Sequence, residues 1–435
     1  MRVLHLSTFE ADAGAGIAAY RLHAGLRRAG VDSRMLVLDR RGDDPTVAAL
    51  RLPRDPVRRV LRRLAKERIR RDLAPYSPPP GYERFRDDRS EHGGDLVRQL
   101  PAADVITLHW VNGMLDYGTF FAEAPRRAPL VWRLADMSPF TGGCHYDYGC
   151  GAFALRCGRC PQLGSDDPGD LSAQVLGRKL AALAQVPAER LHLVAPSTWT
   201  GEMARRSAAL GRFPLTVIPN GLDTAVFAPV AKAEARARLG LPPRARIVMF
   251  VAADVGNRRK GFDLLAEALA GLGDEAPGLL LVSVGRGEPR VAGAPGRHLG
   301  YIGDDARRAL VYAAADLFVI PSLQESFGQT VIEALACGTP VVGFAAGGIP
   351  DLVRPGRTGL LAPVGDAAAL RAAIARLLRD HEDRERMGRE ARAVAEAEYA
   401  SPVQVARYLA LYRRLLGEAD ERTVTGGDED VNVVI

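Results

Sequence analysis

Short apolar runs alternate with helical segments along the whole chain, and this alternation predicts an α/β protein. In the first half of the chain the predicted strands are Val3–Leu6, Arg34–Leu38, Val105–Leu108, Leu130–Leu134, His192–Ala195 and Leu215–Ile218. In the second half they are Ile247–Val251, Leu279–Val284, Leu317–Ile320, Pro340–Phe344 and Gly359–Leu361. Strands that alternate with helices form doubly wound parallel sheets, so we expect two Rossmann-like domains.

The length of the chain fits this division. With 435 residues, of which 47% are hydrophobic, the chain can bury the cores of two domains of ordinary size. We place the boundary near Asn220–Phe227 and predict an N-terminal domain over residues 1–219 and a C-terminal domain over residues 220–401. The polar, glycine-containing segment 419–435 is expected to be flexible.

No apolar segment approaches the ~18 residues that a membrane span requires. The start of the chain, Met1–Leu6, is too short for a signal peptide and is typical of a first strand. We therefore expect the protein to reside in the cytoplasm.

The clearest candidate for chemistry is a loop with two carboxylates, Glu325 and Glu333, eight positions apart. The loop follows the strand Leu317–Ile320 and opens a helix over Gln329–Ala336, and open α/β sheets bind ligands at such strand ends. Free amides at the start of this helix favour a diphosphate. The donor-binding candidates contributed by this loop are Glu325, Ser326, Phe327, Gly328, Thr330 and Glu333. The alternative is a plain turn with two solvated carboxylates.

This segment resembles family 4 of the retaining glycosyltransferases, whose Glu-x7-Glu motif it matches, and the resemblance continues through Thr339–Val353 and Gly356–Leu361. The resemblance implies a GT-B architecture, with two Rossmann-like domains facing a cleft and a last helix, residues 402–418, packed back on the first domain. It also implies that Glu325 contacts the donor sugar and that Glu333 contacts the ribose hydroxyls. Retention of anomeric configuration without a catalytic metal follows from the same resemblance.

A glycine-rich loop follows the first strand, in Ser7–Tyr20. Its Gly14 and Gly16 let the backbone approach a phosphate closely, and the resemblance implies that they border the donor and the acceptor. The same residues fit the G-x-G-x-x-A pattern of NAD-dependent oxidoreductases, with Asp39 at the end of the next strand. A dinucleotide turn is tight, whereas Gly14 comes seven positions after Ser7, which disfavours that alternative.

A basic turn, Arg258–Lys260, follows the strand Ile247–Val251. The resemblance implies that a basic residue and the lysine of a Lys-Gly pair neutralise the departing nucleoside diphosphate. Lys260 matches this pair, and of the two arginines we choose Arg258 over Arg259. The alternative is an exposed basic turn before a helix.

The stretch Val131–Tyr146 resembles a subgroup of capsule and colanic-acid transferases, in which a histidine precedes the aspartate. Here Ala135 stands at the histidine position and Ser138 replaces a tryptophan, whereas Asp136 is retained and is expected to orient an acceptor. Either the enzyme is slow, or another residue such as His109 supplies the missing group, or the protein is a pseudo-glycosyltransferase that binds nucleotide sugars without transfer.

Four cysteines follow in C-x5-C-x6-C-x2-C spacing, namely Cys144, Cys150, Cys157 and Cys160. Disulfides are disfavoured in the cytoplasm, and Cys157 and Cys160 have the spacing of half a four-thiolate zinc site. We expect a structural zinc or a reduced or oxidised structural cluster, with redox chemistry as a lesser alternative, and no cofactor for the transfer chemistry. Cys337 is expected in the core.

Positive charge gathers in residues 51–71, which hold ten cations and two anions, although the net charge of the chain is only +6. Apolar residues recur there at helical spacing, which indicates a basic amphipathic helix that can bind an anionic membrane surface. A solvated helix or a protein partner is the alternative. Nucleic acid is disfavoured because no aromatic residues interleave the charges.

Together these features predict a glycosyltransferase of polysaccharide or glycoconjugate biosynthesis. Its donor is a nucleoside diphosphate sugar, and its acceptor is a saccharide, a lipid-linked sugar or a small molecule. We expect a cytoplasmic protein that is peripheral at the inner face of the membrane through residues 51–71.

Overall fold

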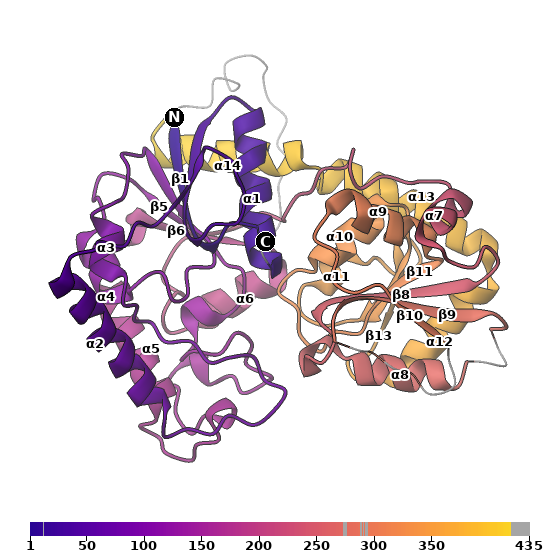
Figure 1. Ribbon diagram of the computed structural model, residues 1–435, viewed down its shortest axis with the longest axis horizontal. Helices are drawn as coiled ribbons and strands as arrows, with labels where there is room; N and C mark the ends of the chain where they lie inside the picture. The colour runs from indigo at the N-terminus through magenta and orange to yellow at the C-terminus, as the bar shows by residue number, and fades with distance from the viewer. Residues whose placement is uncertain (12, 273–275, 288, 290, 292–294, 419–435) are drawn as a thin grey trace, which may run out of the picture.

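Two parallel β-sheets form the framework of the protein in the computed structural model, as the two halves of Figure 1 show. The structure describes residues 1–11, 13–272, 276–287, 289, 291 and 295–418, so the predicted tail 419–435 lies outside the described residues. The strands of the first sheet are β1 Arg2–Phe9, β2 Asp32–Asp39, β3 Val47–Ala49, β4 Val105–Leu108, β5 Leu130–Arg133, β6 Leu191–Ala195 and β7 Leu215–Val217. Those of the second are β8 Arg246–Asp254, β9 Leu279–Arg286, β10 Gly296–His298, β11 Leu317–Ile320, β12 Val341–Phe344 and β13 Gly359–Ala362.

Both sheets are doubly wound, with the strand orders β3-β2-β1-β4-β5-β6-β7 and β10-β9-β8-β11-β12-β13, and every pairing between these strands is parallel. The predicted fold class is confirmed. The sequence analysis missed two of the edge strands, β3 and β10. Each spans only three residues and is mostly exposed, which is too short to show a strand pattern in the sequence.

Helices cover both sheets, and side chains cap several of them. Asp55 accepts a hydrogen bond from the Arg58 amide at the start of α2, and Ser197 accepts one from the Thr200 amide at the start of α6. Such caps each contribute about 0.5–2 kcal/mol. In the N-terminal half the helices are α1 Ala13–Arg28, α2 Pro56–Leu73, α3 Gly93–Val97, α4 Tyr117–Glu123, α5 Leu171–Ala184 and α6 Thr198–Arg206. In the C-terminal half they are α7 Lys232–Leu239, α8 Phe262–Ala270, α9 Asp305–Ala314, α10 Gln329–Ala336, α11 Ile349–Leu352, α12 Ala367–Arg379, α13 His381–Glu398 and α14 Ser401–Leu415.

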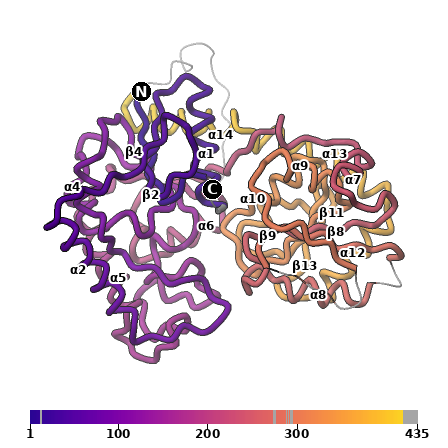
Figure 2. Tube along the Cα trace, in the orientation of Figure 1, coloured from indigo at the N-terminus to yellow at the C-terminus, as the bar shows by residue number. Residues whose placement is uncertain are grey.

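The last helix, α14, leaves the second sheet and packs beside α1 on the first, where Figures 1 and 2 show it as the yellow segment next to the N-terminus. Its Tyr412 is fully buried and shares a hydrogen bond of 2.8 Å with Thr107 of β4. The chain therefore crosses between the sheets twice. The two crossings lie side by side, because the Leu222 amide donates to the Tyr399 carbonyl and the Ser401 amide to that of Leu222.

Among the helices in the described residues, none combines the length and the apolar character that crossing a membrane requires.

Candidate functional site

A cleft of about 500 Å³ lies between the two sheets at the carboxyl ends of their strands. This is the edge at which open α/β sheets bind ligands. The structure brings most of the predicted site residues to this one cleft, namely Gly14, Asp136, Lys260, Glu325, Ser326, Phe327, Gly328, Thr330 and Glu333. Gly16, Arg258 and His109 do not line it.

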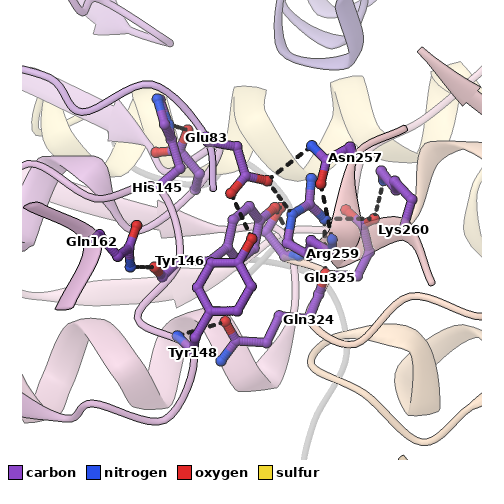
Figure 3. A network of polar contacts seen from close by, with 12 residues as sticks. Glu83, His145, Tyr146, Tyr148, Gln162, Asn257, Arg259, Lys260, Gln324 and Glu325 are labelled. Atoms are coloured by element: carbon purple, nitrogen blue, oxygen red, sulfur yellow. Dashed lines mark hydrogen bonds and ion pairs between the residues drawn. The ribbon is translucent and has the colours of Figure 1, made fainter. Parts of the chain in front are cut away.

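Glu325 lies beside two cations in this cleft, Lys260 and Arg259 (Figure 3). Its Oε2 accepts a hydrogen bond of 2.5 Å from Lys260 Nζ and one of 3.3 Å from Arg259 Nη1. Burial by itself raises the pKa of the Glu325 carboxyl, but the charges of Lys260 and Arg259 outweigh burial and hold this pKa below its ordinary value. Lys260 and Arg259 are thus the cations that this part of the cleft offers to a diphosphate.

Two glycines with positive φ allow the loop that carries Glu325 to pack tightly. Gly261 follows Lys260 with φ +66°, and Gly347 follows β12 with φ +56°. A Cβ on Gly261 would overlap the Pro321 carbonyl, and one on Gly347 would overlap that of Glu325. These glycines therefore permit the close approach that sets Glu325 against the basic turn.

Arg259, not Arg258, is the arginine that faces the cleft, which corrects the choice made from the sequence. Residues Arg258–Lys260 form one 3₁₀ turn, in which successive side chains point about 120° apart. Arg258 is exposed and lies against Gly81, whereas Arg259 is buried and bonds to Glu325.

Glu83 reaches Arg259 from the N-terminal half of the chain, and the sequence analysis missed it. Arg259 Nε donates to Glu83 Oε1 at 2.6 Å, and Asn257 and the Tyr148 hydroxyl donate to the same carboxylate (Figure 3). Burial raises the pKa of Glu83, but Arg259 and the other donors outweigh burial, so this pKa lies below its ordinary value. No local pattern around Glu83 signals this role, because its partners lie far away in the sequence.

The segment that follows β5 also reaches across the cleft. The Arg259 guanidinium lies 4.0 Å from the centre of the Tyr146 ring, which is within the range of a cation–π interaction. Ser326 Oγ donates to the Ala135 carbonyl at 2.7 Å and accepts from the Tyr146 hydroxyl at 3.3 Å. Ala135 thus contributes its backbone where the resemblance led us to expect a histidine side chain.

His145 is the histidine that lines this cleft, and the sequence analysis also missed it. Its Nδ1 lies 2.6 Å from Asp136 Oδ2, and its ring stacks on that of Trp110. Burial alone raises the pKa of Asp136, but His145 and the donors of Ser138 outweigh burial and lower it. Because Asp136 occupies Nδ1, Nε2 is the nitrogen left for a substrate.

His109 cannot take the place of the missing histidine, so that prediction is wrong. It is 1% exposed, and its Nε2 lies 2.8 Å from Nδ1 of His5, away from the cleft. Burial holds the pKa of His109 well below its ordinary value, which keeps the ring neutral. Its role is in the core of the first sheet.

Glu333 lies in α10 and lines the cleft next to α1 of the N-terminal half. Its Oε1 accepts from Arg21 at 2.9 Å, and its Oε2 accepts from the Tyr312 hydroxyl at 3.1 Å. Both oxygens of this buried carboxylate thus already have donors. The predicted contact with ribose hydroxyls requires at least one of these donors to move or to share an oxygen.

The two glycines of the early loop have different surroundings. Gly14 lines the cleft, and a Cβ placed on it would meet no atom within 4 Å. Gly16 packs against Phe9 instead, where an added Cβ would lie 3.2 Å from the Phe9 Cβ. Gly14 is therefore the one of the pair that stands open to a ligand.

The four clustered cysteines line one small cavity of about 20 Å³. Four thiols are a ligand set that suits zinc, yet in the described residues no three His, Cys, Asp or Glu side chains are placed to hold a metal ion. Burial raises the pKa of Cys157 to about 11, so this thiol is protonated at neutral pH. The structural zinc stays a prediction, which elemental analysis of the purified protein tests. Cys337 is buried at the end of α10.

Comparison with known proteins finds a family match in the C-terminal half. Residues 231–394 match the family model described as "Glycosyl transferases group 1". This part of the chain is similar to the group 1 glycosyltransferases. The matched residues include Lys260, Glu325 and Glu333.

A D-inositol 3-phosphate glycosyltransferase of Segniliparus rotundus is 35% identical over 226 residues, which are 49% of this chain and 50% of that protein. A second such protein, from Acidothermus cellulolyticus, is 36% identical over 224 residues, or 46% of this chain and 49% of that protein. The chain thus spans about half the length of the curated relatives it matches.

The fold of the whole chain is that of GT-B glycosyltransferases. Sucrose-phosphate synthase of Thermosynechococcus elongatus superposes with a TM-score of 0.64 at 23% identity, over 96% of this chain and 100% of that one. The HepE protein of Anabaena in complex with UDP-glucose gives a TM-score of 0.64 at 19% identity, over 94% and 100% of the two chains. The two sheets therefore together form a GT-B fold.

Proposed function

We propose that this protein transfers a hexosyl group from a nucleoside diphosphate sugar to an acceptor hydroxyl. The observation that carries the proposal is the cluster of Lys260, Arg259 and Glu325 in a cleft of a GT-B fold, within the residues matched by the group 1 family. The UDP-glucose in the HepE structure supports a nucleotide-sugar donor. Retention of configuration and independence from a catalytic metal are part of the proposal.

In the proposed reaction the bond between the anomeric carbon and the phosphate oxygen breaks, and the electron pair stays on the diphosphate. Lys260 and Arg259 neutralise this leaving group, and such preorganised charge is the main electrostatic contribution to catalysis. The acceptor oxygen forms the new bond to the anomeric carbon. Its proton passes to the leaving phosphate or to His145 Nε2.

Glu333 tests the donor part of the proposal. Glu333→Gln keeps the size of the side chain but removes its charge and replaces one of its two acceptor oxygens with an amide donor, so we expect nucleoside diphosphate binding to weaken by about tenfold or more. Calorimetric titration with UDP and GDP measures this loss. Glu267→Gln, at an exposed position of α8, is the matched control and should bind as the wild-type protein does. Undiminished binding by the Glu333 variant would contradict the donor site.

Transfer separates this function from a nucleotide-sugar binding protein without activity. A transferase that is given a panel of nucleotide sugars and acceptors releases nucleoside diphosphate and forms a glycosylated product. A pseudo-glycosyltransferase binds the nucleotide and forms no product. The paired His145 and Asp136 in the cleft favour the transferase, because a binding protein has no use for a proton acceptor at this position.

We also propose that the protein acts at a membrane surface in polysaccharide or glycoconjugate assembly. The support comes from α2, on which no residue is buried. Its apolar residues Val57, Val60, Leu61 and Leu64 are each 56–67% exposed and recur at helical spacing on one face. Arg62 instead turns toward the protein and donates to Asp95 at 2.9 Å. An apolar stripe that faces outward among cations suits an anionic lipid surface.

Charge introduced into this stripe tests the membrane proposal. We expect Leu61→Glu with Leu64→Glu to lower binding to vesicles of phosphatidylcholine and phosphatidylglycerol by about tenfold or more, because two apolar anchors are lost. Co-sedimentation with vesicles measures the binding. The matched control places the same charges at exposed Leu155 and Val364. Equal loss in the control, or no loss in the α2 variant, would rule out α2 as the membrane contact.

A further inference from the structure

The N-terminal half of the cleft carries guanidinium groups that lack a counter-charge. Arg84, Arg86 and Arg133 all line the cleft, and in the described part of the chain none of them forms an ion pair with a carboxylate. The cations of the opposite half differ, since each has a carboxylate partner. These pairs are Arg259 with Glu83 and Glu325, Lys260 with Glu325, and Arg308 with Asp305 and Glu333.

Arg133 is the most unusual of the three. It ends β5, its exposed fraction is 2%, and its Nε donates to Asn220 Oδ1 at 2.9 Å. Its Nη1 is buried and has no hydrogen-bond partner in the structure. Burying a cation without a compensating anion is unfavourable, and an orphaned donor adds to the penalty. Burial also lowers the pKa of Arg133. An anion in the cleft would relieve both costs.

Arg86 lies on the same side of the cleft, with its guanidinium 5.0 Å from the centre of the Trp110 ring. Its Nε is buried without a partner. The charge of Asp136 stabilises the Arg86 cation, but the Asp136 oxygens already accept hydrogen bonds from His145, Trp110 and Ser138. The guanidinium of Arg86 therefore keeps donors for a ligand.

We propose that the acceptor is anionic and that Arg86 and Arg133 hold its phosphate or carboxylate group. This inference rests on the proposed transferase function and names the class of its acceptor. A guanidinium offers two parallel donors to such a group, which fixes orientation as well as charge. Arg86 and His145 both pack on Trp110, so an anion held by Arg86 brings the acceptor close to Nε2 of His145.

Three sugars that differ in charge test this proposal. Their binding is measured on the full chain, saturated beforehand with the nucleoside diphosphate that it binds. Glucose, glucose 6-phosphate and glucuronate share one ring and differ in charge. Calorimetry is expected to show about tenfold or more tighter binding of the two anions than of glucose, the size of one or two charge-assisted hydrogen bonds. A parallel arm with polyprenyl phosphate in detergent distinguishes a lipid-linked source of the anion from a soluble one. Tighter binding of any anionic probe supports the proposal.

Variants assign the effect to the two arginines. Arg86→Gln and Arg133→Gln should each remove most of the preference for the anionic probe, whereas Arg206→Gln, exposed on α6, should retain it. Arg86 lies nearer the surface than Arg133, so its variant stays informative if Arg133→Gln lowers the folded fraction. Equal affinity for glucose and the anions, or an unchanged preference in the Arg86 variant, overturns the proposal. Failure of the wild-type protein to bind any nucleoside diphosphate contradicts the proposed function instead.

Discussion

A Lys260→Met variant is expected to lose about 10²–10³-fold in kcat for sugar transfer, the usual cost of removing one group that stabilises developing charge. Lys260 Nζ is the nearest cation to Glu325, at 2.5 Å, and Arg259 alone would then face both the leaving diphosphate and two carboxylates. Methionine keeps most of the length of the side chain, so the cleft should retain its shape. Steady-state release of nucleoside diphosphate, with thermal unfolding to verify the fold, measures the effect.

Arg258→Met is the matched control, because it removes a neighbouring cation that is exposed and points out of the cleft. We expect its kcat to stay within about twofold of the wild type, since screened surface charges contribute little. A large loss in the Arg258 variant together with a small one in the Lys260 variant would reverse the assignment of the leaving-group cations.

His145→Ala is expected to lower kcat by about 10²–10⁴-fold if Nε2 accepts or positions the acceptor proton, as general acid–base groups contribute. The affinity for nucleoside diphosphate should stay the same, because His145 contacts the N-terminal half of the cleft and not the Lys260 cluster. Transfer assays and calorimetry on the same preparation separate the two effects.

The variant His109→Gln is the comparison, and it shows whether a buried histidine of the core also affects kcat. His109 is buried beside His5, so its replacement should lower stability and leave kcat per folded molecule unchanged. If the His109 variant loses kcat at full folding while His145→Ala retains it, the histidine expected from the sequence would be the functional one after all.

The sequence predicted those parts of the site that one segment encodes. Glu325, Gly328 and Glu333 belong to one continuous segment of strand, loop and helix. Their positions relative to one another can therefore be inferred from the sequence of that segment. The position of His145 was out of reach, because only the fold of residues 136–145 brings it to Asp136. Glu83 was missed because its partner is 176 residues away.

Side-chain direction was the second limit of the sequence. Arg258 and Arg259 are chemically identical neighbours, and only the 3₁₀ turn decides that the second one enters the cleft. The edge strands β3 and β10 illustrate the same limit for the fold. Three residues are too few to show a strand pattern, so the identity of these strands depends on their pairing with β2 and β9.

The return of α14 to the first sheet means that neither half of this molecule can be separated by one cut in the gene. A fragment that ends at Glu398 contains every strand, yet it leaves the apolar side chains of Val3, Leu22 and Leu26 without their cover of Tyr408 and Tyr412. Such an exposed apolar surface favours aggregation. To exchange the C-terminal half between such proteins thus requires two fusion points, one near Leu222 and one near Tyr399. The two segments that connect the sheets are hydrogen-bonded to each other there.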